Sequence, residues 1–325
     1  EFEKTYALLG VKIDLTTGES AYVESVREVV KEARKKGLAR DSEGALIIPF
    51  PEKEGLPPLM LLKSDGASTY EARDLAAIKV RQRREKPDLV LYEVGADQEL
   101  RFRQLFRAAE RLGYARPGQL VHVAHGLYRF AEGKISTRLG RTVHLEEVLA
   151  EGIARAKKLT GGREEVARAV GIGAIKYNDL SQHHTSEVVF DWEKILNLRG
   201  NSGPYLQYTY ARARSVMRKA GLKTNPSGLE TLTLRVGLEV EEPLLRYLYR
   251  FPEIVEEATM VNSPNLICSY LFSLAQRFNR LYDLRPILRA ENLELRDLRL
   301  GLTAATAQII KNGLTLLGIE APEKL

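Results

Sequence analysis

The sequence contains a single cysteine, Cys268, within an apolar stretch. One cysteine excludes an internal disulfide framework and a cysteine zinc site, and its surroundings predict a small core residue rather than a nucleophile. No apolar run reaches the roughly 18–20 residues of a membrane-spanning helix, and no charged-then-apolar signal peptide opens the chain. We therefore expect a cytoplasmic protein with no membrane partner.

The composition is that of an ordinary globular protein, with 325 residues of which 44% are hydrophobic and 28% charged. Such a chain can bury a real core in two domains or in one large one, so disorder is not expected. The net charge is +6. A basic balance is compatible with a nucleic-acid partner, although many basic proteins bind none.

The first residue is Glu1, and residues 2–9 already have the pattern of a helix interior that stops at Gly10. No N-cap residue precedes this pattern. We therefore expect that the sequence begins inside a longer protein, and a natural short protein that has lost its Met is the alternative.

Residues 1–142 alternate between helix and strand signals. Helices are predicted at 20–36, 70–84 and 98–112, and strands at 45–50, 59–63, 89–94 and 120–125. The strands at 45–50 and 59–63 should form a hairpin. The run 89–94 is continuously apolar, which is typical of a buried parallel strand. Strand, helix, strand, helix, strand in this order predicts a doubly wound α/β sheet.

After about Thr142 the helical period continues almost to the end and strand signals nearly vanish. Helices are predicted at 145–158, 164–177, 192–196, 205–220, 229–249, 252–260, 264–281 and 296–317. The predicted fold class is thus α/β followed by all-α, with domains at 1–142 and 143–325.

Two blocks in the α/β part could bind a small ligand. Tyr70 and Asp74 stand one turn apart at the start of a helix that follows a strand and a Ser/Asp/Gly turn. An acid beside a phenol can hold a cation, and a guanidinium suits a carboxylate best. Gln98 opens the helix after the next strand and could bind a polar ligand. The alternatives are a capped surface helix and an N-cap at Asp97 with an idle Gln98.

A third block is the short basic loop from Gly133 to Gly140. It carries Lys134, Ser136 and Arg138 between the two glycines. A mobile loop with an ammonium and a hydroxyl suits a polyphosphate, because its charge can follow the phosphates during reaction. A basic surface turn is the alternative.

The fourth block lacks acids: none occurs from Arg199 to Lys223. On a helix, Tyr208 shares a face with Arg212, and Tyr210 shares one with Arg214 and Arg218. Aromatic and guanidinium groups that alternate in this way can stack on bases and pair with phosphates. The alternative is a solvated basic helix with its tyrosines in the core.

These four blocks, in this order, resemble arginyl-tRNA synthetase, a class I aminoacyl-tRNA synthetase. Asp191-Trp192 and the tail around 316–319 extend the resemblance over essentially the whole chain. It implies the second half of a Rossmann-like catalytic domain followed by a helical anticodon-binding domain. It also implies ligation of arginine to tRNA(Arg) with ATP as a substrate, Mg²⁺ carried by the nucleotide, no protein-held metal, and a monomer.

The resemblance further implies which residues form each site. The arginine site would consist of Tyr70, Asp74 and Gln98. Lys134 and Ser136 would be catalytic in the family's KMSKS-like loop, and the ATP site would consist of His122, Gly126, Lys134, Ser136 and Arg138. The tRNA-binding set would be Tyr208, Arg212, Arg214 and Arg218.

The sequence departs from the family in two places. Thr137 stands where the second lysine of the KMSKS loop would be, and no HIGH-like sequence occurs. His122 and His125 are three apart on a predicted strand and do not replace it. We therefore expect that this chain alone ligates arginine poorly. The alternative is a non-catalytic tRNA-binding paralogue, which a HIGH-containing stretch directly upstream in the reading frame would exclude.

Overall fold

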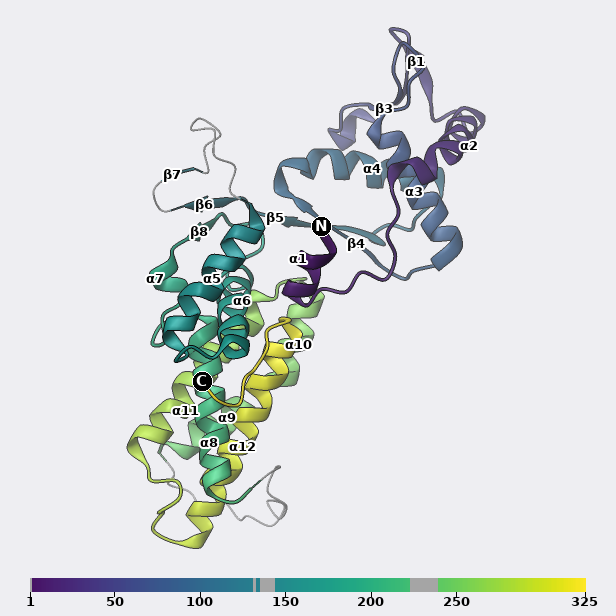
Figure 1. Ribbon diagram of the computed structural model, residues 1–325. Coiled ribbons are helices and arrows are strands. Elements are labelled where there is room, and N and C mark those ends of the chain that lie inside the picture. Colours follow the sequence, from purple (N-terminus) through teal and green to yellow (C-terminus); the bar gives the residue numbers. More distant parts are fainter. Residues whose placement is uncertain (1, 131–132, 135–143, 223–238) are drawn as a thin grey trace. The chain divides into compact units, whose positions relative to one another are not determined.

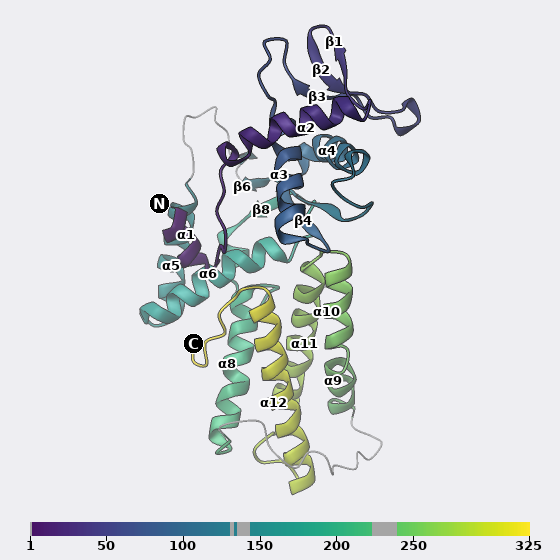
Figure 2. The same ribbon diagram turned by 90° about the vertical axis from the view of Figure 1, so that its right-hand side faces the viewer.

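The computed structural model describes residues 2–130, 133–134, 144–222 and 239–325 (Figures 1 and 2). Contacts divide the chain into two compact units, Ile13–Gly126 and Glu1–Lys12 with Leu127–Leu325. Each unit is described by itself. Ser136, Thr137 and Arg138 lie outside the described residues, and for Lys134 only the backbone is described.

The unit Ile13–Gly126 mixes helices with two small sheets. Its α-helices are α2 (Val23–Lys35), α3 (Tyr70–Glu85) and α4 (Glu99–Leu112), and short 3-10 turns occur at Glu19–Tyr22, Glu52–Glu54 and Ala96–Gln98. Its strands are β1 (Arg40–Ser42), β2 (Ala45–Ile48), β3 (Leu59–Leu62), β4 (Val90–Gly95) and β5 (Leu120–His125). All helices and strands predicted between 20 and 125 are present, and only β1 was not predicted.

Apolar faces of these elements meet in one core. Val29 of α2, Ile48 of β2, Leu61 of β3, Leu75 of α3 and Leu105 of α4 are all fully buried in it. Each such side chain stabilises the fold by about 1.5–3 kcal/mol relative to its exposed state. The core therefore fixes α3 against α4, the two helices that carry the predicted arginine-site residues.

The strands of this unit form two separate sheets instead of one. The predicted hairpin is confirmed, since β2 and β3 are antiparallel with Ile48 opposite Leu59. β4 and β5 are parallel neighbours, with Tyr92 opposite His122, and α4 connects them. The prediction of a single doubly wound sheet is wrong for the described residues, because β3 pairs with β2 and not with β4.

β4 is also less buried than its apolar sequence predicted. Val90, Tyr92 and Val94 pack on the core, whereas Leu91, on the opposite face, is 50% exposed. A strand with one covered face has the same apolar run as one with two, so the run alone could not separate the two cases.

The second unit is mainly helical. Its helices are α1 (Phe2–Leu9), α5 (Leu145–Leu159), α6 (Glu164–Leu180), α7 (Trp192–Ile195), α8 (Gly203–Lys219), α9 (Glu241–Leu248), α10 (Phe251–Met260), α11 (Asn265–Leu284) and α12 (Leu293–Leu316). Its strands are β6 (Tyr128–Phe130), β7 (Gly133–Lys134) and β8 (Val188–Phe190), with β6 between β7 and β8. These strands are two or three residues long, too short to leave a period in the sequence.

Helices α8, α9, α11 and α12 run side by side in both views and enclose one core (Figures 1 and 2). Helix α8 also lies close against α6. A Cβ added at Gly203 would stand 2.6 Å from the carbonyl oxygen of Gly173, so neither helix could approach as closely with a larger residue there. Cys268 is fully buried in this core, and burial raises the pKa of its thiol to about 12. Its predicted place in the core is confirmed.

Within the described residues, no helix is both long and apolar enough to cross a membrane. The same residues contain no group of three His, Cys, Asp or Glu side chains that could hold a metal ion.

Candidate functional site

The start of α3 is fixed by a network of short-range hydrogen bonds. The Asp65 carboxylate accepts a hydrogen bond from the Ala67 amide at 2.8 Å in the turn after β3. Thr69 is the N-cap residue: its hydroxyl accepts from the Ala72 amide at 3.2 Å and donates to the Met60 carbonyl at 2.7 Å. The turn and the cap thus tie the first residues of α3 to the end of β3.

Three side-chain acceptors converge on one guanidinium. The guanidinium belongs to Arg101, in the first turn of α4, and its Nη2 donates to the Asp74 carboxylate. Nη1 donates to Gln98 Oε1 at 2.8 Å, and Nε donates to Glu71 Oε1 at 3.2 Å. We call Asp74, Gln98 and Glu71 the guanidinium clasp. Two of its three members, Asp74 and Gln98, were predicted from the sequence to bind arginine.

The clasp is half-buried and acidic. The side chains of Asp74 and Arg101 are 36% and 30% exposed. Burial raises the pKa of the Asp74 carboxyl, the Arg101 guanidinium partly offsets this rise, and Glu71 adds to it. When both carboxyls are ionised, one guanidinium neutralises only one of the two charges, so the clasp favours cations.

Tyr70 is not among the groups that contact this guanidinium. Its side chain is 62% exposed, and its ring lies 5.2 Å from the guanidinium carbon of Arg73. Arg73 itself pairs with Glu19 at 2.7 Å and donates to the Ser68 carbonyl at 3.2 Å. The structure therefore brings Asp74 and Gln98 together on one guanidinium. The ring of Tyr70 lies beside a different one, that of Arg73.

Glu71 and Arg101 were not among the residues predicted from the sequence. The available signal was helical spacing, because Glu71 is three residues before Asp74 on α3 and Arg101 is three after Gln98. The contact between the two helices joins residues 27 positions apart. Spacing within one helix could not predict it.

The carboxyl end of β4 lies next to the clasp along the chain, since Gln98 closes the 3-10 turn that follows β4. His122 is held inside the unit: its Nε2 lies 3.0 Å from the Val94 carbonyl oxygen, and its ring stacks on Phe102 with centroids 4.6 Å apart. Gly126 is the last residue of the unit, and its carbonyl oxygen lies 3.2 Å from His125 Nδ1. The predicted ATP-binding roles of His122 and Gly126 stay predictions.

On α8, Arg212 is sandwiched between two tyrosines. Its guanidinium carbon lies 4.9 Å from the ring centre of Tyr208 and 4.7 Å from that of Tyr282. Nη1 donates to Asn279 Oδ1 at 2.8 Å. Tyr208 is 39% exposed. Tyr282 is 40% exposed, so both aromatic rings beside this cation reach the surface, where a ring is suited to stacking on a base.

Arg214 and Arg218 of α8 are already paired with the C-terminal tail. Arg214 Nη2 lies 3.0 Å from Glu323 Oε1, and Arg218 Nη1 donates to the Glu323 carbonyl at 3.2 Å. Tyr210, which shares their face, is 2% exposed and belongs to the core. Both sequence interpretations thus apply to α8, with Tyr210 in the core and Tyr208 at the surface.

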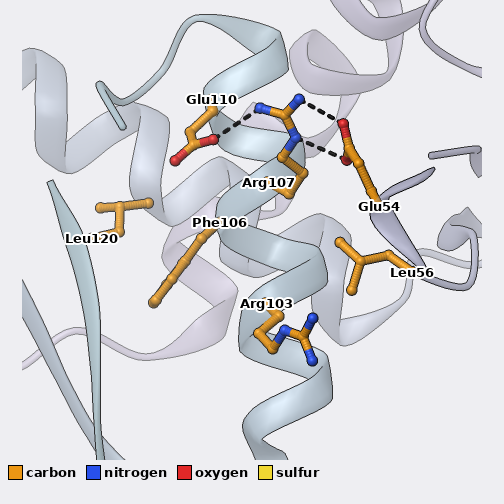
Figure 3. A pocket seen from close by; sticks show the side chains of 7 residues that line it. All are labelled: Glu54, Leu56, Arg103, Phe106, Arg107, Glu110 and Leu120. Atoms are coloured by element: carbon orange, nitrogen blue, oxygen red, sulfur yellow. Dashed lines mark hydrogen bonds and ion pairs between the residues drawn. The ribbon is translucent and has the colours of Figure 1, made fainter. Parts of the chain in front are cut away.

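The other side of α4 lines a shallow pocket in which the charges other than that of Arg103 are already paired (Figure 3). Its walls are Glu54, Leu56, Arg103, Phe106, Arg107, Glu110 and Leu120. Arg107 lies between two carboxylates, 2.7 Å from Glu54 and 3.1 Å from Glu110. Figure 3 shows Arg103 pointing away from these ion pairs. Apart from Arg103, the pocket offers no unpaired charge among its labelled residues, so it points to no ligand.

Two protein-family models match the chain. Residues 1–192 match the class I (R) tRNA synthetase catalytic domain, and residues 206–325 match the DALR anticodon binding domain. The first model covers more than half of the chain. The chain belongs to the arginyl-tRNA synthetase family.

Curated relatives agree with this membership. The arginine–tRNA ligase of Chloroflexus aggregans is 40% identical over 334 residues, which cover 99% of this chain and 58% of that protein. The enzyme of the same name from Clostridium acetobutylicum is 36% identical over 333 residues, with 100% and 58% covered. The chain thus spans a little over half the length of these arginyl-tRNA synthetase family members.

Solved structures confirm the predicted fold class. The arginyl-tRNA synthetase of Plasmodium falciparum has a TM-score of 0.86 at 26% identity, covering 100% of this chain and 56% of that one. That of Thermus thermophilus has a TM-score of 0.85 at 26% identity, with 99% and 62% covered. A class I catalytic fold is followed by a helical anticodon-binding domain. The expected domain boundary at 142 stays a prediction. The catalytic family model ends at residue 192 and the anticodon-binding model begins at 206, whereas the compact units divide after Gly126.

Proposed function

We propose that these 325 residues supply the arginine-selecting and tRNA-binding parts of an arginine–tRNA ligase. One observation supports this most directly: Asp74 and Gln98 jointly hold a guanidinium, the functional group of the arginine side chain. A carboxylate selects a guanidinium over neutral side chains by charge, and over an ammonium by two parallel hydrogen bonds.

The reaction would proceed in two steps. A carboxylate oxygen of arginine attacks the α-phosphorus of ATP, the bond to the β-phosphate oxygen breaks, and pyrophosphate leaves with both electrons of that bond. A hydroxyl of the terminal adenosine of tRNA then attacks the arginyl carbonyl carbon, and AMP leaves. The protein's contribution to such steps is mostly positioning and charge neutralisation.

The remaining roles follow from the family resemblance. Lys134, Ser136 and Arg138 would bind and neutralise the phosphates, and His122 and Gly126 would lie on the adenine side. Mg²⁺ would neutralise phosphate charge, and because the described residues offer no acidic cluster for it, its ligands would come mainly from the nucleotide. Tyr70 would complete the arginine site only if its phenol turned toward Asp74, since it is exposed now.

The helical unit would bind tRNA through α8. Tyr208 would stack on a base, and Arg212, Arg214 and Arg218 would contact mostly phosphates. Phosphate contacts make affinity fall steeply with salt, so a flat salt dependence would contradict this part of the proposal.

We further propose that the chain alone does not ligate arginine at a useful rate. Its sequence has no HIGH-like segment. The loss of one positioned donor from an active site already costs roughly 100- to 1,000-fold in rate, and a whole missing segment should cost more. ATP–pyrophosphate exchange with arginine and tRNA measures the first step. Robust exchange by this chain would refute the proposal of inactivity and would strengthen that of ligase identity.

Arginine binding separates this proposal from a non-catalytic tRNA-binding paralogue. A ligase-derived site should bind arginine, measured by calorimetry, even when turnover is absent. A chain that binds tRNA but no guanidinium compound would support the paralogue instead.

A further inference from the structure

The guanidinium clasp is filled by the protein's own Arg101. All three of its contacts come from acceptors on α3 or at the start of α4. Arg101 donates to Asp74 and Gln98, the same two groups that the proposed function assigns to the side chain of the substrate. An arginine side chain from the protein therefore lies where an arginine side chain from the substrate would have to bind.

We propose that Arg101 is an internal competitor for the arginine substrate. Its guanidinium occupies the clasp, and the substrate guanidinium must displace it in order to bind. This inference rests on the proposed function, because it requires that Asp74 and Gln98 form the arginine site.

The two guanidinium groups would compete for the same oxygen atoms of Asp74 and Gln98. Gln98 offers one amide oxygen as an acceptor, and Arg101 Nη1 already lies 2.8 Å from it. The Asp74 carboxylate accepts from Arg101 Nη2. A second guanidinium on the same acceptors would place two positive charges within a few ångströms in a half-buried site, where their repulsion is strong. Binding of the substrate guanidinium in the same place therefore requires that the hydrogen bonds of Arg101 to Asp74 and Gln98 break.

Glu71 gives the displaced side chain a place to stay. It holds Arg101 through Nε at 3.2 Å, on the part of the guanidinium nearest the helix, and not through the two terminal nitrogens. Arg101 is 30% exposed and has a long unbranched side chain, so its terminal nitrogens can turn to solvent while the Glu71 pair is kept. Displacement therefore leaves neither a buried unpaired cation nor a rearranged backbone.

The consequence is a uniform reduction in affinity. An internal group that must first leave lowers the apparent affinity of every competing ligand by the same factor. Arginine and methylguanidine would thus both bind more weakly than the clasp allows, while the ratio of their affinities would not depend on Arg101. A residue that only positions Asp74 would not act in this way.

The test compares Arg101→Gln with the unaltered full chain. Calorimetric titration with arginine and with methylguanidine should give dissociation constants that are smaller in the variant by about three- to tenfold for both ligands. Arg103→Gln is the matched control, because Arg103 is exposed two residues further along α4. That control should leave both constants unchanged. Circular dichroism would verify that each variant is folded.

A second measurement needs no variant for its main result. In an NMR titration of the full chain, the Nη–H resonances of Arg101, whose hydrogen bonds to Asp74 and Gln98 must break, should move as arginine is added and saturate with the calorimetric dissociation constant. Arg101→Gln serves only to assign the resonances. Resonances that stay in place while arginine binds would overturn the proposal.

The remaining outcomes are distinguishable. Weaker or unchanged binding in folded Arg101→Gln would overturn the internal competitor and make Arg101 a positioning partner of Asp74, with the proposed function intact. Absence of guanidinium binding in both the chain and the variant would overturn the arginine site itself, and with it this inference.

Discussion

The guanidinium clasp on α3 and α4 and the arginine row on α8 are both regions in which groups predicted to bind an external partner already have an internal one. In the clasp, Asp74 and Gln98 hold Arg101. On α8, Arg214 and Arg218 are paired with Glu323 of the C-terminal tail. The two regions have opposite signs, since the clasp presents acceptors to a cation and α8 presents cations to an anion.

The regions differ in how firmly the internal partner is held. Three hydrogen bonds fix Arg101 in a half-buried site. Glu323 is 51% exposed on a chain terminus, and exposed ion pairs contribute only about 0–1 kcal/mol. A polyanion can therefore displace Glu323 at little cost, whereas a small ligand must compete with Arg101 on nearly equal terms.

The largest effect is expected for Asp74→Asn. The substitution removes the only predicted acceptor that carries charge, and a hydrogen bond to a charged group contributes about 1.5–3 kcal/mol. Arginine binding by calorimetry should weaken roughly 10- to 150-fold. Asp88→Asn is the control. The Asp88 carboxylate is fully exposed and makes a long ion pair of 4.0 Å with Arg116, so the loss of its charge should leave arginine binding unchanged. If the two substitutions weakened arginine binding equally, Asp74 would not be part of the arginine site.

The next effect is the pH dependence of arginine binding. Only ionised Asp74 attracts a guanidinium, and burial raises its pKa above the ordinary 3.8. Affinity should be full at neutral pH and fall as the pH drops through this raised pKa, by about tenfold for each unit below it. The midpoint should therefore lie above 3.8. The negative charge of Glu71 raises the pKa of Asp74 further, whereas the Arg101 guanidinium lowers it. Glu71→Gln should therefore move the midpoint to lower pH.

A smaller effect is expected on α8 for Arg212→Lys. The charge is kept, but the planar group between Tyr208 and Tyr282 is lost. Stacking and cation–π contacts contribute about 0.5–1 kcal/mol each, so RNA affinity measured by fluorescence anisotropy should fall about three- to tenfold. Arg246→Lys on α9, where Arg246 pairs with Glu242, is the control. An unchanged affinity would show that Arg212 contributes charge alone.

The smallest effect is expected for Glu323→Gln, which removes the carboxylate that lies 3.0 Å from Arg214 and 3.8 Å from Arg218. RNA affinity at low salt should rise about two- to threefold, and its dependence on salt should become steeper. Glu320→Gln removes the same charge three residues earlier but frees Arg168 of α6 instead. If both substitutions strengthen binding equally, net charge alone explains the effect and the pairing on α8 has no part in it.

Much of the fold could be predicted from the sequence because most of it depends on local periods. Helices such as α3 and the strand β5 occur where apolar spacing and turn residues placed them. Asp74 and Gln98 could be found because each stands at a strand end or helix start, where ligand-binding groups gather. The exposed face of β4 could not be found, since Leu91 has the same neighbours in sequence whether or not anything covers it.

The occupant of the clasp was also beyond the sequence. Arg101 reaches Asp74 only because the packed core sets α3 against α4, and no periodicity encodes a contact between two helices. Tyr70 illustrates the same limit: its place one turn before Asp74 predicted a shared contact, yet its ring lies under Arg73. Helical spacing predicts which residues share a face but not which neighbour each side chain takes.

The most direct measurement compares arginine with citrulline, its neutral isostere, in calorimetric titrations of the full chain. Citrulline keeps the shape of arginine but cannot neutralise Asp74, so it would leave a half-buried carboxylate unpaired. Arginine should bind, citrulline should not bind detectably, and Asp74→Asn should remove the difference. Equal binding of the two compounds would contradict the assignment of Asp74 and its partners as a guanidinium site.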